Sequence, residues 1–98
     1  MFQNCVIEIP KKSGIYSSFW DDECVVYHEL SGRTHLIEGL GAFLFNAISK
    51  SSITHSQLLV DINATFELPT DLDLEKFLEN LIVEYQALGL LEVTENSY

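Results

Sequence analysis

The sequence predicts a small α+β domain, winged-helix-like, in which a three-stranded antiparallel sheet is followed by three helices. Three observations predict this class. Before Gly39, apolar and β-branched segments alternate with turn signals, as in short strands. After Gly39, apolar residues recur at helical spacing. At 98 residues, of which 47% are hydrophobic, the chain is long enough for one modest core and too apolar for a disordered protein.

The composition restricts the class of partner. Fifteen acidic residues against five basic ones give a net charge of −10. This charge repels phosphate, so we expect neither nucleic acid nor an anionic membrane as the main partner. The N-terminus lacks the basic and apolar segments of a signal peptide, and no apolar run approaches transmembrane length. We therefore expect a cytoplasmic protein in which Cys5 and Cys24 are free thiols and Cys24 is a small buried hydrophobe.

The strands are expected in the first forty residues. An apolar alternation at 6–9, stopped by Pro10, indicates a short strand or a loosely docked arm within 1–13. The main domain is expected at 14–93 and the tail at 94–98. Its first strand spans 15–20 and ends at the two aspartates of a turn.

The hairpin that joins the second and third strands is the central feature of the sequence. Apolar and β-branched residues run through 24–30 and again through 34–37. A two-residue turn at Ser31 and Gly32 is expected between them, since glycine supplies the positive φ that a tight turn needs. The expected cross-strand pairs are Leu30 with Arg33, His28 with His35, Tyr27 with Leu36 and Val26 with Ile37.

Helices are expected at about 40–49 and 55–66. Thr54 and Gln57, three residues apart, have the spacing of a capping box and mark the start of the second helix. An apolar residue on each side of Thr54, at positions 53 and 58, forms a hydrophobic staple in this interpretation.

The third helix is expected to be capped by Thr70 or Asp71 and followed by Gly89 as its C′ residue. Its apolar stripe is broad and contains Leu74, Phe77, Leu78, Leu81, Ile82, Tyr85 and Leu88. Three residues of this stripe are expected to be substantially buried, namely Phe77, Leu81 and Tyr85. A short return strand is expected at 90–93.

His28 and His35 are the strongest candidates for a metal-binding pair, because the expected register places them opposite each other. A zinc site needs three or four ligands, and His55, at the start of the second helix, is not spaced to join them. A partly exposed cross-strand pair is the simpler reading, so we expect no metal and no cofactor. Cys24 and His28 lie roughly 13 Å apart along a strand, too far for a nucleophile and its base, so enzyme activity is not expected.

The hairpin also carries a family resemblance. The residues concerned are Trp20-Asp21-Asp22-Glu23, Val25-Val26-Tyr27-His28, Ser31-Gly32 and Thr34-His35-Leu36. With the helical half, they resemble the short PqqD-like proteins, in particular the HPr-rel-A system PqqD family peptide chaperones. The resemblance covers about 14–93. It departs at Arg33, where the family usually has an acidic residue, and at Glu38, where it often has Asn or Asp.

This resemblance implies a leader-recognition element of a pathway for ribosomally made, modified peptides. Such a domain binds the leader of a precursor peptide along its third strand, beside the third helix, and presents it to a modifying enzyme. A kinase-like or nucleotidyltransferase-like neighbour is suggested. The third strand is also an expected open edge. The predicted peptide-binding residues are Arg33, Thr34, His35, Leu36, Ile37, Glu38, Leu74, Lys76, Phe77, Leu78, Asn80 and Leu81.

Two other functions fit the same pattern. A structural interaction or dimerisation module would use the same edge strand, so the chain is expected as a monomer or a dimer. In the simplest alternative, 90–93 covers that edge. An acidic winged-helix regulator is the third possibility, but its recognition helix would face phosphate repulsion. The charged residues expected on that helix are Asp73, Glu75, Glu79 and Glu84 against a single Lys76.

Overall fold

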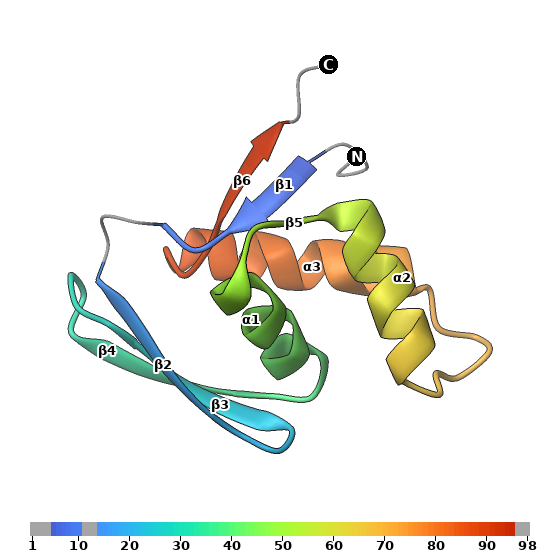
Figure 1. Ribbon diagram of the computed structural model, residues 1–98, viewed down its shortest axis with the longest axis horizontal. Helices are drawn as coiled ribbons and strands as arrows, with labels where there is room; N and C mark the ends of the chain where they lie inside the picture. The colour runs from blue at the N-terminus through green and yellow to red at the C-terminus, as the bar shows by residue number, and fades with distance from the viewer. Residues whose placement is uncertain (1–4, 11–13, 96–98) are drawn as a thin grey trace.

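Three helices and two small antiparallel sheets make up the computed structural model, which describes residues 5–10 and 14–95 (Figure 1). The main sheet has the order β2 (Ile15–Trp20), β3 (Glu23–His28) and β4 (Arg33–Glu38). The second sheet has the order β5 (Ile53–Thr54), β1 (Cys5–Glu8) and β6 (Glu92–Glu95). The helices are α1 (Leu40–Lys50), α2 (His55–Thr65) and α3 (Leu74–Ala87). The α+β class is confirmed, whereas the expectation of a single sheet is wrong.

The second sheet ties the start of the chain to its end. β1 lies within the segment 1–13, and its Ile7 pairs with Ile53 on one side and Val93 on the other. Ile7 is fully buried. Segments this short show no diagnostic alternation, because β5 has two residues and β6 four. The return strand begins at Glu92, two residues later than expected, since Leu90 and Leu91 are buried in the core.

The β3–β4 hairpin has a longer turn than predicted. His28 pairs with Arg33 and Val26 pairs with His35, so the expected His28–His35 pair is wrong. The turn contains the four residues between His28 and Arg33, not two. Leu30, expected in the ladder, lies in this turn and is 75% exposed.

Local hydrogen bonds explain the longer turn. The Gly32 N–H donates to the His28 carbonyl at 2.8 Å, and Gly32 has φ 70°. The Ser31 N–H donates to Nδ1 of His28 at 3.2 Å, and the Ser31 hydroxyl lies 2.8 Å from the same atom. The histidine side chain therefore organises the turn that a glycine alone was expected to form, and four-residue loops are a common hairpin solution.

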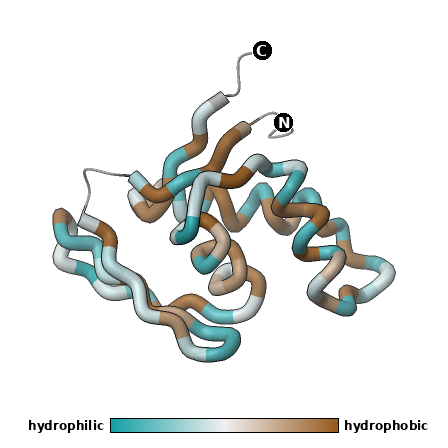
Figure 2. Tube along the Cα trace, viewed as in Figure 1, coloured by the Kyte–Doolittle hydropathy of each residue, from teal (hydrophilic) through white to brown (hydrophobic). Residues whose placement is uncertain are grey.

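α1 lies at the centre of the molecule, between the main sheet and α3 (Figure 1). It is predominantly hydrophobic in sequence (Figure 2), and Leu44, Phe45 and Ile48 are buried. Cys24 and Val26 of β3 face it from the sheet and are fully buried. The expectation that Cys24 is a small buried hydrophobe is thus confirmed.

The N-terminus of α2 follows the sequence signal in part. Thr54 is the N-cap, and its Oγ1 accepts a hydrogen bond from the Gln57 N–H at 3.1 Å. The Gln57 side chain does not complete a reciprocal capping box, because its Nε2 donates to Oδ1 of Asp61 at 2.8 Å, one turn further on. One half of the predicted box is therefore confirmed.

α3 begins later than expected. Asp73 is its N-cap and accepts from the Lys76 N–H at 3.2 Å, so Thr70 and Asp71 do not cap it. Those two residues lie in a turn closed by the Leu72 N–H, which donates to the Pro69 carbonyl at 3.1 Å. The helix therefore starts only after this turn.

The buried face of α3 is centred on Leu78 and Ile82, which are 1% and 0% exposed. The prediction of a buried Phe77 is wrong, since Phe77 lies at the margin of the stripe and is 41% exposed. Leu81 and Tyr85 are half-buried. Gly89, with φ 77°, follows the helix as expected. None of the helices in the described residues is long and apolar enough to cross a membrane.

Candidate functional site

β4 is an outer strand of the main sheet and pairs only with β3 within the described residues (Figure 1). The Gly39 N–H, directly after β4, donates to the Asp22 carbonyl at 3.0 Å. Backbone groups alternate sides along a strand, so those of Thr34, Leu36 and Glu38 point away from β3. The observed register differs from the expected one by an even number of residues, which is why these three stay on the outer side.

No described strand covers this edge. The alternative in which 90–93 covers it is wrong, because β6 pairs with β1 of the other sheet. Leu90 and Leu91 are buried instead in the core. An outer strand with unpaired N–H and C=O groups is a template for an added strand.

The side chains of β4 divide between two faces. Thr34, Leu36 and Glu38 are exposed on the face that looks away from the helices. Ile37 points into the core and is 5% exposed, so its side chain is not available to a peptide. His35 shares the core-facing side and is half-buried. Arg33 is exposed at the start of the strand.

The end of α3 approaches the β3–β4 hairpin on its helix-facing side. A Cβ placed on Gly41 would lie 2.7 Å from Cγ2 of Ile37 and would also meet the hydroxyl of Tyr85. A Cβ placed on Gly89 would lie 3.3 Å from Nε2 of His28, which pairs with the first residue of β4. The end of α3 therefore reaches the helix-facing side of the β3–β4 hairpin at two points, near Ile37 and near His28.

The residues of α3 that were predicted for the site differ in their distance from Tyr85 and in their burial. Leu74 precedes Tyr85 by about three turns, roughly 16 Å along the helix axis. Leu78 is 1% exposed and cannot contact a peptide. Leu81 lies one turn before Tyr85 on the same helix face. Three predicted residues are exposed on the half of α3 that is remote from Tyr85, namely Lys76, Phe77 and Asn80.

Two residues of this neighbourhood were missed by the prediction, Tyr85 and Leu88. Tyr85 is half-buried and packs edge-to-face on Phe45 of α1, with ring centroids 5.2 Å apart. Burial raises the pKa of Tyr85 above its usual value, with Glu84 adding to the shift, so its hydroxyl stays a neutral donor. Leu88 is 41% exposed. Both belong to the predicted stripe, and the sequence carries no signal that Tyr85 approaches Ile37 of β4.

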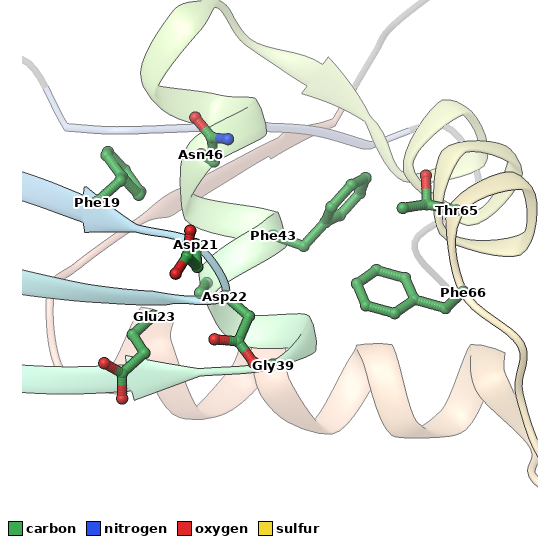
Figure 3. Close-up of a pocket in the computed structure, with 10 residues that line it drawn as sticks. Phe19, Asp21, Asp22, Glu23, Gly39, Phe43, Asn46, Thr65 and Phe66 are labelled. Carbon is green, nitrogen blue, oxygen red and sulfur yellow. The ribbon is translucent and has the colours of Figure 1, made fainter.

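A separate pocket of about 210 Å³ opens between the β2–β3 turn, the start of α1 and the end of α2. Figure 3 shows Phe43 and Phe66 on one side of it and the carboxylates of Asp21 and Asp22 on another. The two phenylalanine rings meet edge-to-face, with centroids 5.3 Å apart. This volume is below the range of most cofactor and small-molecule sites, so the pocket does not indicate a cofactor.

The histidines are not arranged as a metal centre. Nδ1 of His28 is held by Ser31, and His35 lies opposite Val26. Within the described residues, no group of three His, Cys, Asp or Glu side chains is placed to hold a metal ion. His55 is fully buried, and desolvation lowers its pKa, although nearby Glu75 and Glu79 oppose the shift.

Cys24 is not an activated nucleophile in this structure. Both cysteines are free thiols, and Cys24 is buried. Burial raises the pKa of the Cys24 thiol, which keeps it protonated and unreactive at neutral pH. The feature that stands out in the described residues is therefore the unpaired outer edge of β4.

Comparisons of the chain with protein-family models, curated proteins and solved structures found no match. The PqqD-like resemblance therefore stays a prediction from the sequence, and any functional conclusion depends on the geometry of β4 and its surroundings.

Proposed function

We propose that this chain is a non-catalytic, PqqD-like peptide chaperone or adaptor that binds a precursor (leader) peptide as an added strand at β4. It presents the peptide to a modifying enzyme, for which a kinase-like or nucleotidyltransferase-like protein is the suggested class, in the cytoplasm. The observation that carries the proposal is the open backbone edge at Thr34, Leu36 and Glu38. Backbone hydrogen bonds would supply affinity, and the adjoining side chains would supply selectivity.

The surroundings of β4 suit an extended chain. An added strand lies about 4.8 Å from β4, and its alternate side chains point to the two faces of the sheet. Those on the helix side would approach His35 and the end of α3, where half-buried Tyr85 supplies apolar surface. Those on the other side would lie next to Thr34 and Leu36.

Charge would add selectivity. The protein has a net charge of −10, which favours a basic or neutral peptide over an acidic one. Arg33 is exposed at the start of β4 and would pair with an acidic residue near one end of the peptide. Exposed Glu75 and Glu84 of α3 would favour basic residues elsewhere.

The arrangement is winged-helix-like in this proposal, with α2 and α3 following the main sheet. Reading DNA with α3 is the less favoured alternative, because exposed Asp73, Glu75 and Glu84 outnumber Lys76 and would repel phosphate. Dimerisation through β4 is the other alternative. Size-exclusion chromatography across a range of protein concentrations distinguishes it, since an obligate dimer would occupy the edge.

The proposal is tested by amide chemical-shift mapping during titration with synthetic extended peptides, including the leader of any short precursor peptide that a neighbouring gene is found to encode. We expect the largest shifts at residues 33–38 and along 81–89. Leu36→Pro should abolish binding, because the Leu36 N–H points outward and proline removes that donor without removing a bond to β3.

The matched control is a proline on the opposite edge. The Glu29 N–H donates to the Gly14 carbonyl at 3.0 Å, so alternation directs the Ser17 N–H away from β3 at the edge of β2. Ser17→Pro should leave binding within about twofold of the unsubstituted protein. Binding that survives Leu36→Pro in a folded variant, or that falls equally in Ser17→Pro, would contradict strand addition at β4.

A further inference from the structure

The outer face of the main sheet carries a continuous apolar surface. The helices of the described chain lie on the other side of this sheet (Figure 1). Side chains alternate between the two faces along each strand. Cys24 and Val26 are buried on the helix-facing side, so the side chains that alternate with them point outward. The apolar members of this outward set, which we call the outer patch, are Tyr16, Trp20, Val25, Tyr27 and Leu36.

The outer patch is unusually exposed for residues of this kind. Tyr16 is 58%, Trp20 55% and Leu36 61% exposed. Four of the residues are contiguous, because Tyr16 pairs with Tyr27 across β2 and β3, and Val25, next to Tyr27 on this face of β3, pairs with Leu36 of β4. Trp20 lies at the end of β2 and pairs with Glu23. The two tyrosine rings are stacked, with centroids 6.4 Å and planes 27° apart. Single exposed apolar residues are normal, whereas a contiguous patch marks an interaction surface.

Carboxylates adjoin the outer patch and lack basic partners. Glu23 pairs with Trp20 on one side and with Glu38 on the other, so two acidic residues face each other across β3 and β4. Like charges directly opposite each other destabilise a sheet. Within the described residues, no basic side chain forms an ion pair with either glutamate. Glu29 adds a third carboxylate and accepts from the Tyr16 hydroxyl at 3.4 Å.

We propose that the outer patch is a docking surface for a second protein whose apolar contact residues are surrounded by lysine and arginine. A cationic side chain between Glu23 and Glu38 would relieve their repulsion, and it would also lie near the ring of Trp20, where cation–π attraction adds to binding. A second copy of this chain fits poorly, because it would bring another pair of facing glutamates and another net charge of −10 to the contact.

This surface is distinct from the edge used in the proposed function. Strand addition uses the backbone of β4 in the plane of the sheet, whereas the outer patch uses side chains perpendicular to that plane. The two modes of binding use different groups of β4, and Leu36 contributes its N–H to the first and its side chain to the second. The docking surface does not depend on strand addition being correct.

Trp20 makes the proposal directly testable, since it is the only tryptophan of the chain. The probe is a synthetic amphipathic helical peptide with leucine on one face and lysine on the other. Its counterpart carries glutamate at every lysine position. A helix cannot add as a strand, so β4-edge binding does not contribute. We expect the lysine peptide to shift Trp20 emission to shorter wavelength and to bind at least tenfold more tightly than the glutamate peptide.

Variants assign the binding to the patch. Tyr27→Ser and, separately, Leu36→Ser should each weaken binding of the lysine peptide at least fivefold. Val60→Ser is the matched control, because Val60 is equally apolar and 60% exposed but lies on α2. It should leave binding unchanged. Replacing Glu23 and Glu38 by glutamine should remove most of the preference for lysine over glutamate.

Three results of the titrations with these peptides would overturn the proposal. They are equal binding of the two peptides, unmoved Trp20 emission on binding, and a loss in Val60→Ser that matches the loss in folded Tyr27→Ser. An emission shift that follows protein concentration without any peptide would show that a second copy occupies the patch, and would also overturn it. Melting curves establish that each variant is folded.

Discussion

Leu78→Ala should be among the most destabilising single truncations in α3. Leu78 is 1% exposed and lies in the middle of the buried face of the helix, with fully buried Ile82 one turn later. Truncation removes the transfer free energy of the lost atoms and leaves a cavity between α3 and the rest of the core. We therefore expect a loss that is large for so small a domain.

The magnitude follows from this burial. A fully buried leucine replaced by alanine costs about 2–5 kcal/mol of unfolding free energy. For a domain of this size, 1 kcal/mol lowers the melting temperature by about 4–8 °C, so Leu78→Ala should lower it by roughly 8–40 °C. Total stabilities of native domains are about 5–15 kcal/mol, so the variant is expected to be only marginally folded.

Two other variants of α3 make the measurement decisive. Val83 is 53% exposed, so Val83→Ala should change the unfolding free energy by less than about 0.5 kcal/mol. Phe77 is 41% exposed, and Phe77→Ala should cost clearly less than Leu78→Ala. The assay is urea unfolding followed by circular dichroism. A larger loss for Phe77→Ala than for Leu78→Ala would show that the other face of α3 is buried and would refute this reasoning.

Two further predictions concern the contacts around α1 and α2. Gly41→Ala gains about 1 kcal/mol of helix propensity. Its new methyl group would meet Ile37 and Tyr85, however, and such overpacking costs about 1–3 kcal/mol. Urea unfolding should therefore show a net loss of stability, and this loss should be smaller when Tyr85 is also replaced by phenylalanine. His55 has a pKa lowered by burial, so it contributes stability that is present above its unfolded pKa of about 6.5 and is lost as pH falls below that value. His55→Gln should therefore flatten the change in urea midpoint between pH 7.5 and pH 5.5. An unchanged slope in His55→Gln would contradict this assignment.

Local signals predicted the helix ends better than the strand pairing. Thr54 caps α2 and Gly89 follows α3 because the required chemistry, a hydroxyl acceptor and a residue with positive φ, is encoded at one position. The β3–β4 turn depends on more. A glycine at position 32 fits both a two-residue and a four-residue loop, and the choice is set by the hydrogen bonds between His28 and Ser31. Such a side-chain contact has no signature in hydrophobic periodicity.

The candidate site was also predicted only in part. The outward groups of β4 were identified correctly, since an error of two residues in register preserves which backbone groups face β3. The helix side of the site was not. A stripe as broad as that of α3 contains more apolar residues than one face can bury, so periodicity alone does not choose between Phe77 and Leu78 at its centre. It also cannot show that Tyr85, not Leu74, lies beside β4.

β4 combines two recognition directions in one strand, and Leu36 belongs to both. Its N–H points outward in the plane of the sheet, and its side chain, 61% exposed, points out of that plane beside Val25. Leu36→Pro removes the donor and keeps an apolar ring, whereas Leu36→Ser keeps the donor and removes the apolar side chain. Strand addition should therefore be abolished by proline and only weakened by serine. Docking on the outer patch should be weakened by serine at least fivefold and much less by proline. If both substitutions reduced both kinds of binding equally in folded protein, the edge and the patch would have to be a single surface.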